Sequence, residues 1–551
     1  MELLIDLFGY LSIVVHGLTI LAQSMALGGV LFLVLLARPL LRTIGTGVAR
    51  RTATMAAWSA VGLMTAETVT VALQAAVLMG TLDIGIVTAL TANAAVAGIV
   101  KIVASGVLGI LLFRRGHDAP GAQLLALSGI VLAAATLTTH AAARLDDRGP
   151  LLAAAFLHQA GAAIWIGGIP SFIAALAWVD DGVASRAIGR RFSRMSMAGV
   201  GSILASGIVM SVFYIGDWEG FYGTAYGVMV GAKIGLFLML LALGGLNFLS
   251  VERLRADPAT SVNRLRRCAE AEIGIGVAVF FAAASLTSVP PAVDLTQDRA
   301  TWADIVARNF PEWPRFSSPD HDTLAIPALQ ARLDAEAAHH AARPSVAFVP
   351  GAGELPPRNA EDVAWSEYNH HWSGLFVVAI GLLALLDRAG VSRAKHWPLL
   401  FIGLGAFLFV RSDPEVWPLG DIGFIESFRD VEVLQHRVFV LLIVGFALFE
   451  WRVRAGNWRN KAAALVFPLM CAAGGTLLLT HSHAISNVKE QLLIEVTHTP
   501  LALAGIVAGW ARWLELRLDP VGSPVLTRVA GWTWPVCLLL CGLILLDYRE
   551  A

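Results

Sequence analysis

Charged residues are scarce in this sequence, and their scarcity excludes an ordinary soluble protein. Only 15% of the 551 residues are charged, whereas 56% are hydrophobic, and the mean hydropathy is +0.68. A typical soluble domain has about 25% charged residues. The composition therefore predicts a protein that crosses a membrane several times.

Cysteine is also rare, and motifs for covalent haem attachment or nucleotide binding are missing. The four cysteines form no CxxC and no CxxCH motif, which excludes a c-type haem. There is no Walker motif, so ATP hydrolysis is not expected. No sequence feature resembles a nucleic-acid surface. We therefore expect neither a nucleotide nor a nucleic acid among the partners.

Long apolar segments fill most of the chain. About fourteen of them are long enough to cross roughly 30 Å of hydrocarbon as helices. They predict an all-α fold, a polytopic transmembrane bundle of eight plus six helices in the lipid bilayer. The segments lie near residues 8–37, 53–80, 86–113, 121–140, 151–178, 195–215, 225–250, 271–290, 369–387, 397–411, 436–451, 462–480, 493–514 and 529–547.

Arginine and lysine gather in alternate loops, for example at 186–194 and 253–267, whereas the opposite loops carry acids such as Asp146 and Asp413. Short loops rich in arginine and lysine remain on the cytoplasmic side of a membrane. The pattern predicts a multi-pass protein of the bacterial inner membrane with both termini in the periplasm.

The chain is expected to have three parts. Residues 1–290 form an eight-helix membrane domain, and 291–368, which begins after Pro290, form a periplasmic spacer. Residues 369–551 form a six-helix domain rich in histidine. The halves also share a pattern, because His140 precedes His158 by 18 residues and His481 precedes His498 by 17.

The most informative residues are eight histidines that fall on or near the periplasmic face of the predicted topology. Imidazole is the commonest side-chain metal ligand, and two histidines are also the usual axial ligands of a b-type haem. A one-sided group of histidines therefore predicts a bound metal ion or a b-type haem. The candidates are His16, His140, His158, His371, His436, His481, His483 and His498.

Two further sets of side chains within the predicted membrane segments are candidate functional residues. Met25, Met79, Met210 and Met229 could offer soft thioether ligands to Cu(I), although methionine is more often a packing residue. Glu67, Lys101 and Lys233 are charges inside predicted helices, where an unpaired charge is costly. We expect Glu67 to pair with one of the lysines, and two roles of the charged set stay open, structural ion pairing on the one hand and gating or proton coupling on the other.

Two motifs resemble a known family. The run "TTHAAA…LHQAGAAIWIGGIPSF" (138–172) and the run "YGTAYGVMVGAKIGLFLMLLALGGLNF" (222–248) are similar to segments of the copper resistance protein D family. The resemblance covers about residues 1–290. It implies an inner-membrane protein of copper homeostasis that moves copper between periplasm and cytoplasm, with a periplasmic copper chaperone as a further partner.

Three functions remain open at this point. The first is a copper-handling membrane protein that takes up or transfers copper from the periplasmic face and is not an enzyme. The second is a b-type cytochrome or membrane metal reductase, for which the inner side offers only His117 and His396. The third is a copper sensor or chaperone-docking protein that binds copper without transporting it.

Overall fold

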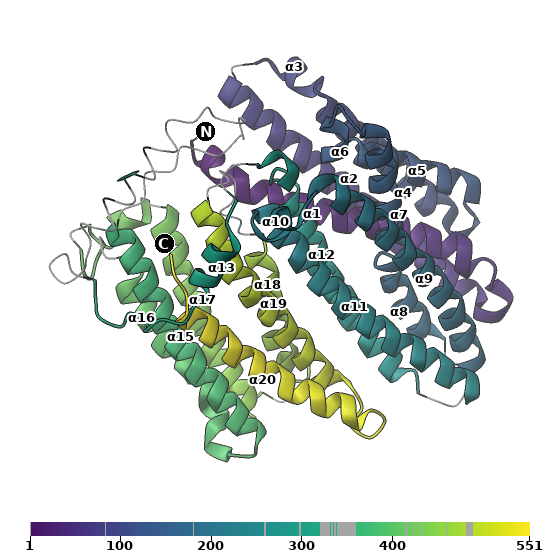
Figure 1. The fold of residues 1–551 in the computed structure, drawn as a ribbon. Coiled ribbons are helices and arrows are strands. Elements are labelled where there is room, and N and C mark those ends of the chain that lie inside the picture. Colours follow the sequence, from purple (N-terminus) through teal and green to yellow (C-terminus); the bar gives the residue numbers. More distant parts are fainter. Residues whose placement is uncertain are drawn as a thin grey trace. The chain divides into compact units, whose positions relative to one another are not determined.

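The structure of the chain is a computed structural model (Figure 1). All of the secondary-structure elements in its described residues are helices. The predicted all-α helical bundle is therefore confirmed. The structure describes residues 2–82, 84–179, 181–257, 261–296, 299–319, 331, 334–335, 338, 360–413, 416–420, 422–429, 431–458, 460–480 and 489–550.

The described residues form two compact units, which are considered one at a time. The first unit contains Met1–Ala300, and the second contains most of the described residues from Thr301 onward. The three-part division at residues 290 and 368 remains a prediction.

The first unit is built from long apolar helices joined by short ones. The short helices are α3 (Ile86–Leu90), α6 (His140–Ala143) and α10 (Trp218–Tyr222). The longer helices are α1 (Glu2–Phe32), α2 (Leu41–Leu82), α4 (Asn93–Arg115), α5 (Gly121–Thr136), α7 (Arg148–Trp165), α8 (Ile169–Trp178), α9 (Gly182–Tyr214), α11 (Ala225–Ala256) and α12 (Asn263–Leu286).

Glycines determine where two of these helices cross. A Cβ atom on Gly167 would collide with the backbone of Ser24 in α1, and a Cβ atom on Gly28 would collide with the backbone of Gly167. Small residues allow helices in a membrane to approach this closely. The glycines of the sequence Trp-Ile-Gly-Gly (165–168) therefore have a structural reason. At the same place, the predicted single segment 151–178 divides into α7 and α8.

The second unit packs its helices around aromatic side chains. Trp397, Phe467 and Trp534 are almost completely buried in one core with Ile380. The helices are α13 (Trp302–Arg308), α15 (Ala360–Arg388), α16 (Leu400–Arg411), α17 (Val431–Arg454), α18 (Val466–Leu478), α19 (Lys489–Arg517) and α20 (Pro524–Leu546).

Fewer helices qualify as membrane spans among the described residues than the fourteen segments predicted. In the described part of the chain, nine helical runs are long and apolar enough to cross a membrane. The predicted segments 121–140 and 462–480 correspond to the shorter apolar helices Gly121–Thr136 and Ala463–Leu478. The segments 397–411, 436–451 and 493–514 fall on α16, α17 and α19. The order of the predicted segments is preserved, whereas several helix lengths are not.

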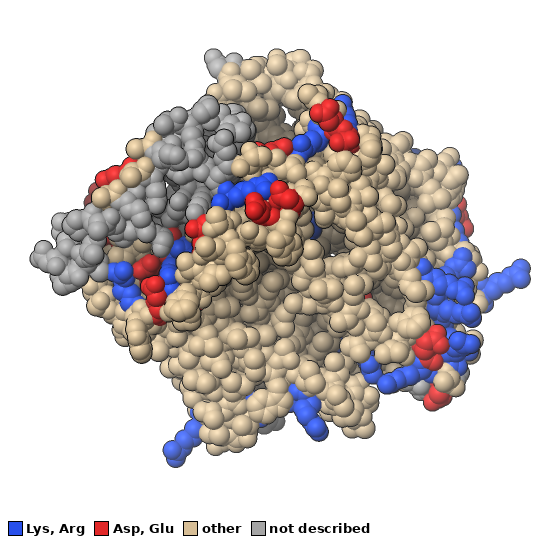
Figure 2. Space-filling view, viewed as in Figure 1, with Lys and Arg blue, Asp and Glu red and all other residues tan. Residues whose placement is uncertain are grey.

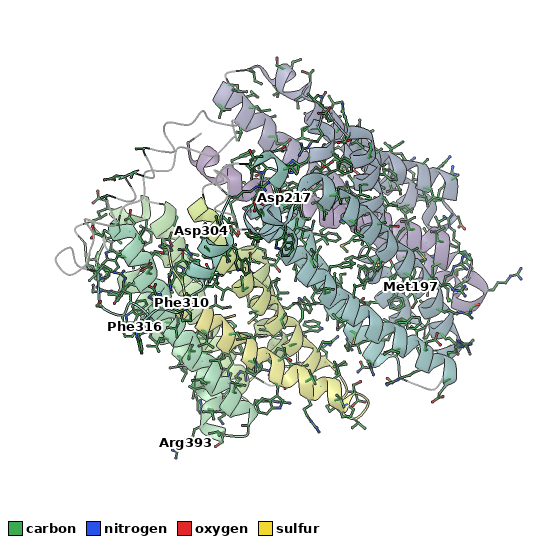
Figure 3. The ribbon with its side chains drawn as sticks, in the orientation of Figure 1. Met197, Asp217, Asp304, Phe310, Phe316 and Arg393 are labelled. Atoms are coloured by element: carbon green, nitrogen blue, oxygen red, sulfur yellow. The ribbon has the colours of Figure 1, made fainter. Side chains whose placement is uncertain are left out.

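The residues just after α12 fold back onto the first unit. The Arg299 guanidinium lies 2.9 Å from both carboxylate oxygens of Asp217, which is labelled in Figure 3, and it also donates to the carbonyl of Ala292. The Ala300 amide donates to the carbonyl of Gly223. These contacts fasten the chain to the loop between α9 and α11.

Candidate functional site

His140 is the first residue of α6, the single helical turn between α5 and α7. Its imidazole ring lies 6.3 Å from the Tyr214 ring, and it hydrogen-bonds to the backbone of Leu286. The His140 Nε2 atom is buried and has no hydrogen-bond partner. Burial lowers the pKa of His140, although the hydrogen bond to Leu286 opposes the shift. A neutral ring with an unpartnered nitrogen is the form of histidine that binds a metal.

His158 lies in α7, deeper than the sequence suggested. Its helix begins at Arg148, so His158 is about 15 Å from the start of the helix at 1.5 Å per residue. The Nδ1 atom is 3.1 Å from the hydroxyl of Ser206, and that hydroxyl itself donates to the carbonyl of Ser202. His158 Nδ1 is therefore the donor, which leaves the Nε2 lone pair for another ligand.

Lys233 of α11 is the charged group that acts on His158. Within the described residues it has no ion pair. Lys233 is close enough to His158 for an electrostatic interaction, and two positive charges repel each other. Lys233 would also oppose a copper ion that moves deeper into the bundle.

A second set of polar side chains joins α1, α2 and α4. Lys101 Nζ lies 2.7 Å from Glu67 Oε2, and the two side chains are only 4% and 3% exposed. The predicted pairing of Glu67 with a lysine is thus confirmed, with Lys101 as the partner. His16 is close enough to Lys101 for an electrostatic interaction, and the hydroxyls of Thr19 and Thr70 lie 3.3 Å apart.

The four candidate methionines have different surroundings. Met229 is buried one helical turn before Lys233, whereas Met79 is 37% exposed. Met25 and Met210 are half-buried. Of the four, Met229 is the residue best shielded from the bilayer.

The structure adds one residue that the sequence reasoning missed, the buried Glu272 of α12. The Asn247 amide donates to Glu272 Oε2 at 2.5 Å, and the Trp165 side chain also hydrogen-bonds to this carboxyl group. Trp165 belongs to the first quoted motif and Asn247 to the second. An acidic residue inside the predicted segment 271–290 was the signal that could have identified it.

Two of the predicted histidines of the second unit are held by strong hydrogen bonds. His371 Nδ1 accepts from the backbone N–H of Arg315 at 2.7 Å, and Nε2 donates to the carbonyl of Tyr548 at 2.8 Å. His436 Nδ1 lies 2.6 Å from Asp413 Oδ1. Both nitrogens of His371 are therefore engaged with the protein backbone.

His370, which was not among the predicted metal ligands, lies in a cluster of aromatic rings. Its ring stacks on Tyr548 at 3.8 Å and lies 6.1 Å from the ring of His498. The His370 Nδ1 atom donates to the carbonyl of Ser366 at 2.8 Å. Tyr548 also lies 5.5 Å from His498. A porphyrin between the two imidazoles could not occupy this space unless Tyr548 moved.

The predicted histidines do not form one centre in the described part of the chain. No three or more side chains of His, Cys, Asp or Glu converge there on a point that could hold a metal ion. His481 and His483 lie outside the described residues. The first unit therefore offers single imidazole nitrogens, and any complete coordination sphere needs a further ligand or a movement of the helices.

Comparison with known proteins supports the copper interpretation. Residues 186–286 match the family described as "Copper resistance protein D". A relative described as "Copper transport protein CutJ", from Bacillus subtilis (strain 168), is 36% identical over 173 residues. The alignment covers 31% of this chain and 30% of the relative, so the match spans less than a third of either protein.

No solved structure gives a significant match to the chain. The family match contains the second quoted motif, residues 222–248, together with Glu272. The family predicted from the motifs is confirmed over residues 186–286, most of α9 through α12, which match the copper resistance protein D family.

Proposed function

We propose that the chain binds copper at the periplasmic face of the bacterial inner membrane and takes up or transfers the ion across it. The family match and the copper transport protein among its relatives support this function. The separation of basic and acidic loops supports a topology with both termini in the periplasm. Copper is the cargo in this proposal, and the chain is not an enzyme.

One observation carries the proposal, the buried Nε2 atom of His140 without a hydrogen-bond partner. A buried polar atom without a partner is rare and costly in proteins. Copper accepts neutral imidazole in either oxidation state. A copper ion at His140 would supply the missing partner, and Tyr214 and Leu286 would keep the ring in place.

The deeper polar groups would then act on the ion after it has bound. His158 offers a second imidazole nitrogen, and Lys233 is positioned to repel a cation that approaches it. The Glu67–Lys101 pair and His16 form a separate polar set in the same unit. We propose that these charges make passage of copper depend on a rearrangement of the helices.

The test is elemental analysis of the purified full-length protein after copper loading and desalting. We expect the His140→Ala/His158→Ala double variant to lose copper affinity by about tenfold or more. Mutation of a group that only hydrogen-bonds to a metal ligand already lowers metal affinity by about 10–100-fold. The control is His117→Ala, in the loop that follows α4, which should bind copper like the wild type.

Three results would contradict the proposal. Unchanged copper binding in the double variant would exclude His140 and His158 as ligands. Iron at about one atom per chain, with the absorption spectrum of a b-type haem, would instead favour the cytochrome. Stoichiometric binding without copper flux in proteoliposomes would favour the sensor or docking protein.

A further inference from the structure

Helix α9 carries arginines and exposed apolar residues along the same face. The arginine group, defined as Arg186, Arg190 and Arg194, recurs every fourth residue. The apolar group that follows it consists of Met197, Leu204, Ile208 and Val212, all exposed, with Met197 labelled in Figure 3. With about 100° of rotation per residue, all seven side chains lie within about 80° of the helix circumference.

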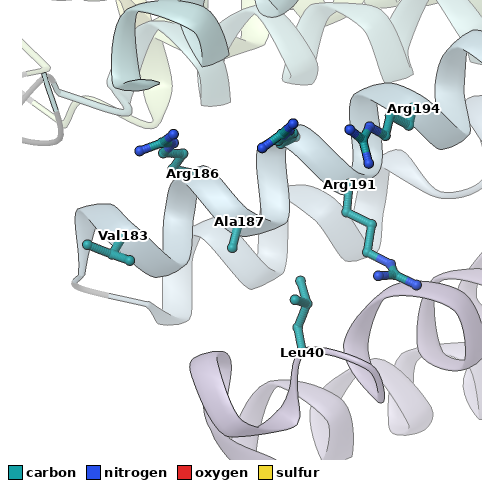
Figure 4. Close-up of a pocket in the computed structure, with 7 residues that line it drawn as sticks. Leu40, Val183, Arg186, Ala187, Arg191 and Arg194 are labelled. Atoms are coloured by element: carbon teal, nitrogen blue, oxygen red, sulfur yellow. The ribbon is translucent and has the colours of Figure 1, made fainter. Parts of the chain in front are cut away.

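The arginine group lines an open pocket of about 410 Å³ between α9 and the connection from α1 to α2 (Figure 4). Leu40, Val183 and Ala187 supply its apolar wall, and Arg191 completes the lining. Among the described residues, no acidic side chain lines this pocket. Figure 2 shows Lys and Arg side chains gathered close to where Figure 3 labels Met197.

The charges of the arginine group are not neutralised by the protein. Within the described residues, Arg186, Arg190 and Arg194 form no ion pair. Like charges four residues apart on a helix repel each other. Asp181, the nearest described acid on this helix, accepts hydrogen bonds from the backbone of Val183 and Ala184. The pocket therefore has a surplus of positive charge that an anion would relieve.

Arg191 differs from the arginine group because it already has a partner. Its Nε atom donates to the carbonyl of Leu35 at 2.6 Å. Leu35 lies in the short π-helix Leu33–Ala37 at the end of α1. This contact joins the two walls of the pocket.

Most of the apolar part of α9 is exposed. Only 11% of the most apolar stretch of the span Gly182–Tyr214 is buried within the protein. In a membrane this surface contacts acyl chains. A ligand in the pocket would therefore contact positively charged arginines at one end and an exposed apolar helix face beside them.

We propose that this face of α9 binds an anionic phospholipid. The phosphate lies in the pocket against the arginine group, and an acyl chain follows the apolar group toward Val212. Guanidinium groups pair well with phosphate, and basic pockets between membrane helices bind anionic lipid headgroups. Free phosphate shares the headgroup chemistry but cannot contact the apolar group. The proposal is independent of copper binding.

The experiment uses the delipidated full-length protein without copper, in detergent. Its thermal unfolding midpoint is measured during titration with phosphatidylglycerol, phosphatidylcholine, glycerol phosphate or inorganic phosphate. We expect only phosphatidylglycerol to raise the midpoint saturably at low concentration. In Arg190→Gln/Arg194→Gln, the half-saturating concentration should rise by about tenfold or more, because one lost charge-assisted contact already costs a factor of about ten.

The matched control is Arg114→Gln/Arg115→Gln, two exposed arginines at the end of α4 that do not line the pocket. It should respond to phosphatidylglycerol like the wild type. Without lipid, Arg190→Gln/Arg194→Gln should unfold at or above the wild-type midpoint, because a repulsion is removed. An equal loss in both double variants would overturn the site. Saturation by inorganic phosphate at the same concentration would overturn the lipid as its ligand.

Discussion

The two units of this protein hold their histidines in different ways. In the first unit, His140 Nε2 is buried without a partner, and His158 uses only Nδ1 for its hydrogen bond to Ser206. In the second unit, His371 uses both ring nitrogens in hydrogen bonds to the backbone, and His436 pairs with Asp413. The same residue type can therefore offer a lone pair to a metal or fasten one segment of the chain to another.

This difference indicates which histidines to test for copper and which for stability. A nitrogen that accepts from a backbone N–H has no lone pair left for a metal, and a nitrogen that donates to a carbonyl is protonated. By that criterion His371 is a structural residue, whereas His140 and His158 remain candidate ligands.

The largest expected effect concerns the buried ion pair of the first unit. Lys101→Met would leave the Glu67 carboxylate without its partner and should destabilise the protein by about 3–5 kcal/mol. The Lys101→Met/Glu67→Gln double variant should recover most of this loss, since neither charge remains. The measurement is unfolding in mixed detergent micelles.

Lys461→Met serves as the control, because Lys461 is exposed. Its stability should match that of the wild type. If the double variant is as unstable as Lys101→Met, the lysine acts through packing and not through its charge, and the role of the ion pair is refuted.

An intermediate effect should separate the two kinds of histidine. His371→Ala removes two hydrogen bonds and leaves the Arg315 amide and the Tyr548 carbonyl unpaired, which should cost about 2 kcal/mol. Copper binding should not change. His140→Ala should show the reverse, weaker copper binding with little change in stability. Lower copper affinity in His371→Ala at unchanged stability would contradict the assignment.

Much of the fold was predictable because apolar length and loop charge are local properties of the sequence. Each predicted segment falls on helices, although 86–113 is divided between α3 and α4, and 151–178 is interrupted where Gly167 meets the backbone of Ser24. The second interruption depends on a residue more than a hundred positions away. The sequence alone offers no signal for such a contact beyond the paired glycines.

The candidate site was predictable only in part, because its contacts also join residues that are distant in sequence. The charge of Glu67 required a partner, but the choice of Lys101 over Lys233 depends on how α2 and α4 pack. Glu272 was missed because its partners, Asn247 and Trp165, come from different helices. His371 was predicted as a ligand, and the sequence offered no sign of its hydrogen bonds because both backbone partners are distant in sequence.

The smallest expected effect concerns a loop of the first unit, which is fastened by an ion pair at the surface. Hydrogen bonds from the Gly220 amide and from Arg299 hold the pKa of Asp217 below its usual value. A carboxyl group with a lowered pKa in the folded state contributes stability above its unfolded pKa and loses it as the pH falls through the folded pKa. Asp217 is exposed, so the effect should be confined to the loop.

Hydrogen exchange at the Ala300 amide, which donates to Gly223, measures this effect. Protection, corrected for the intrinsic exchange rate, should fall as the pH drops below the ordinary aspartate range, and Asp217→Asn should already show the lower protection at neutral pH. Asp118→Asn, at a largely exposed carboxylate, should leave Ala300 protected. Equal protection in Asp217→Asn and the wild type would mean that the backbone contacts fasten this loop without the ion pair.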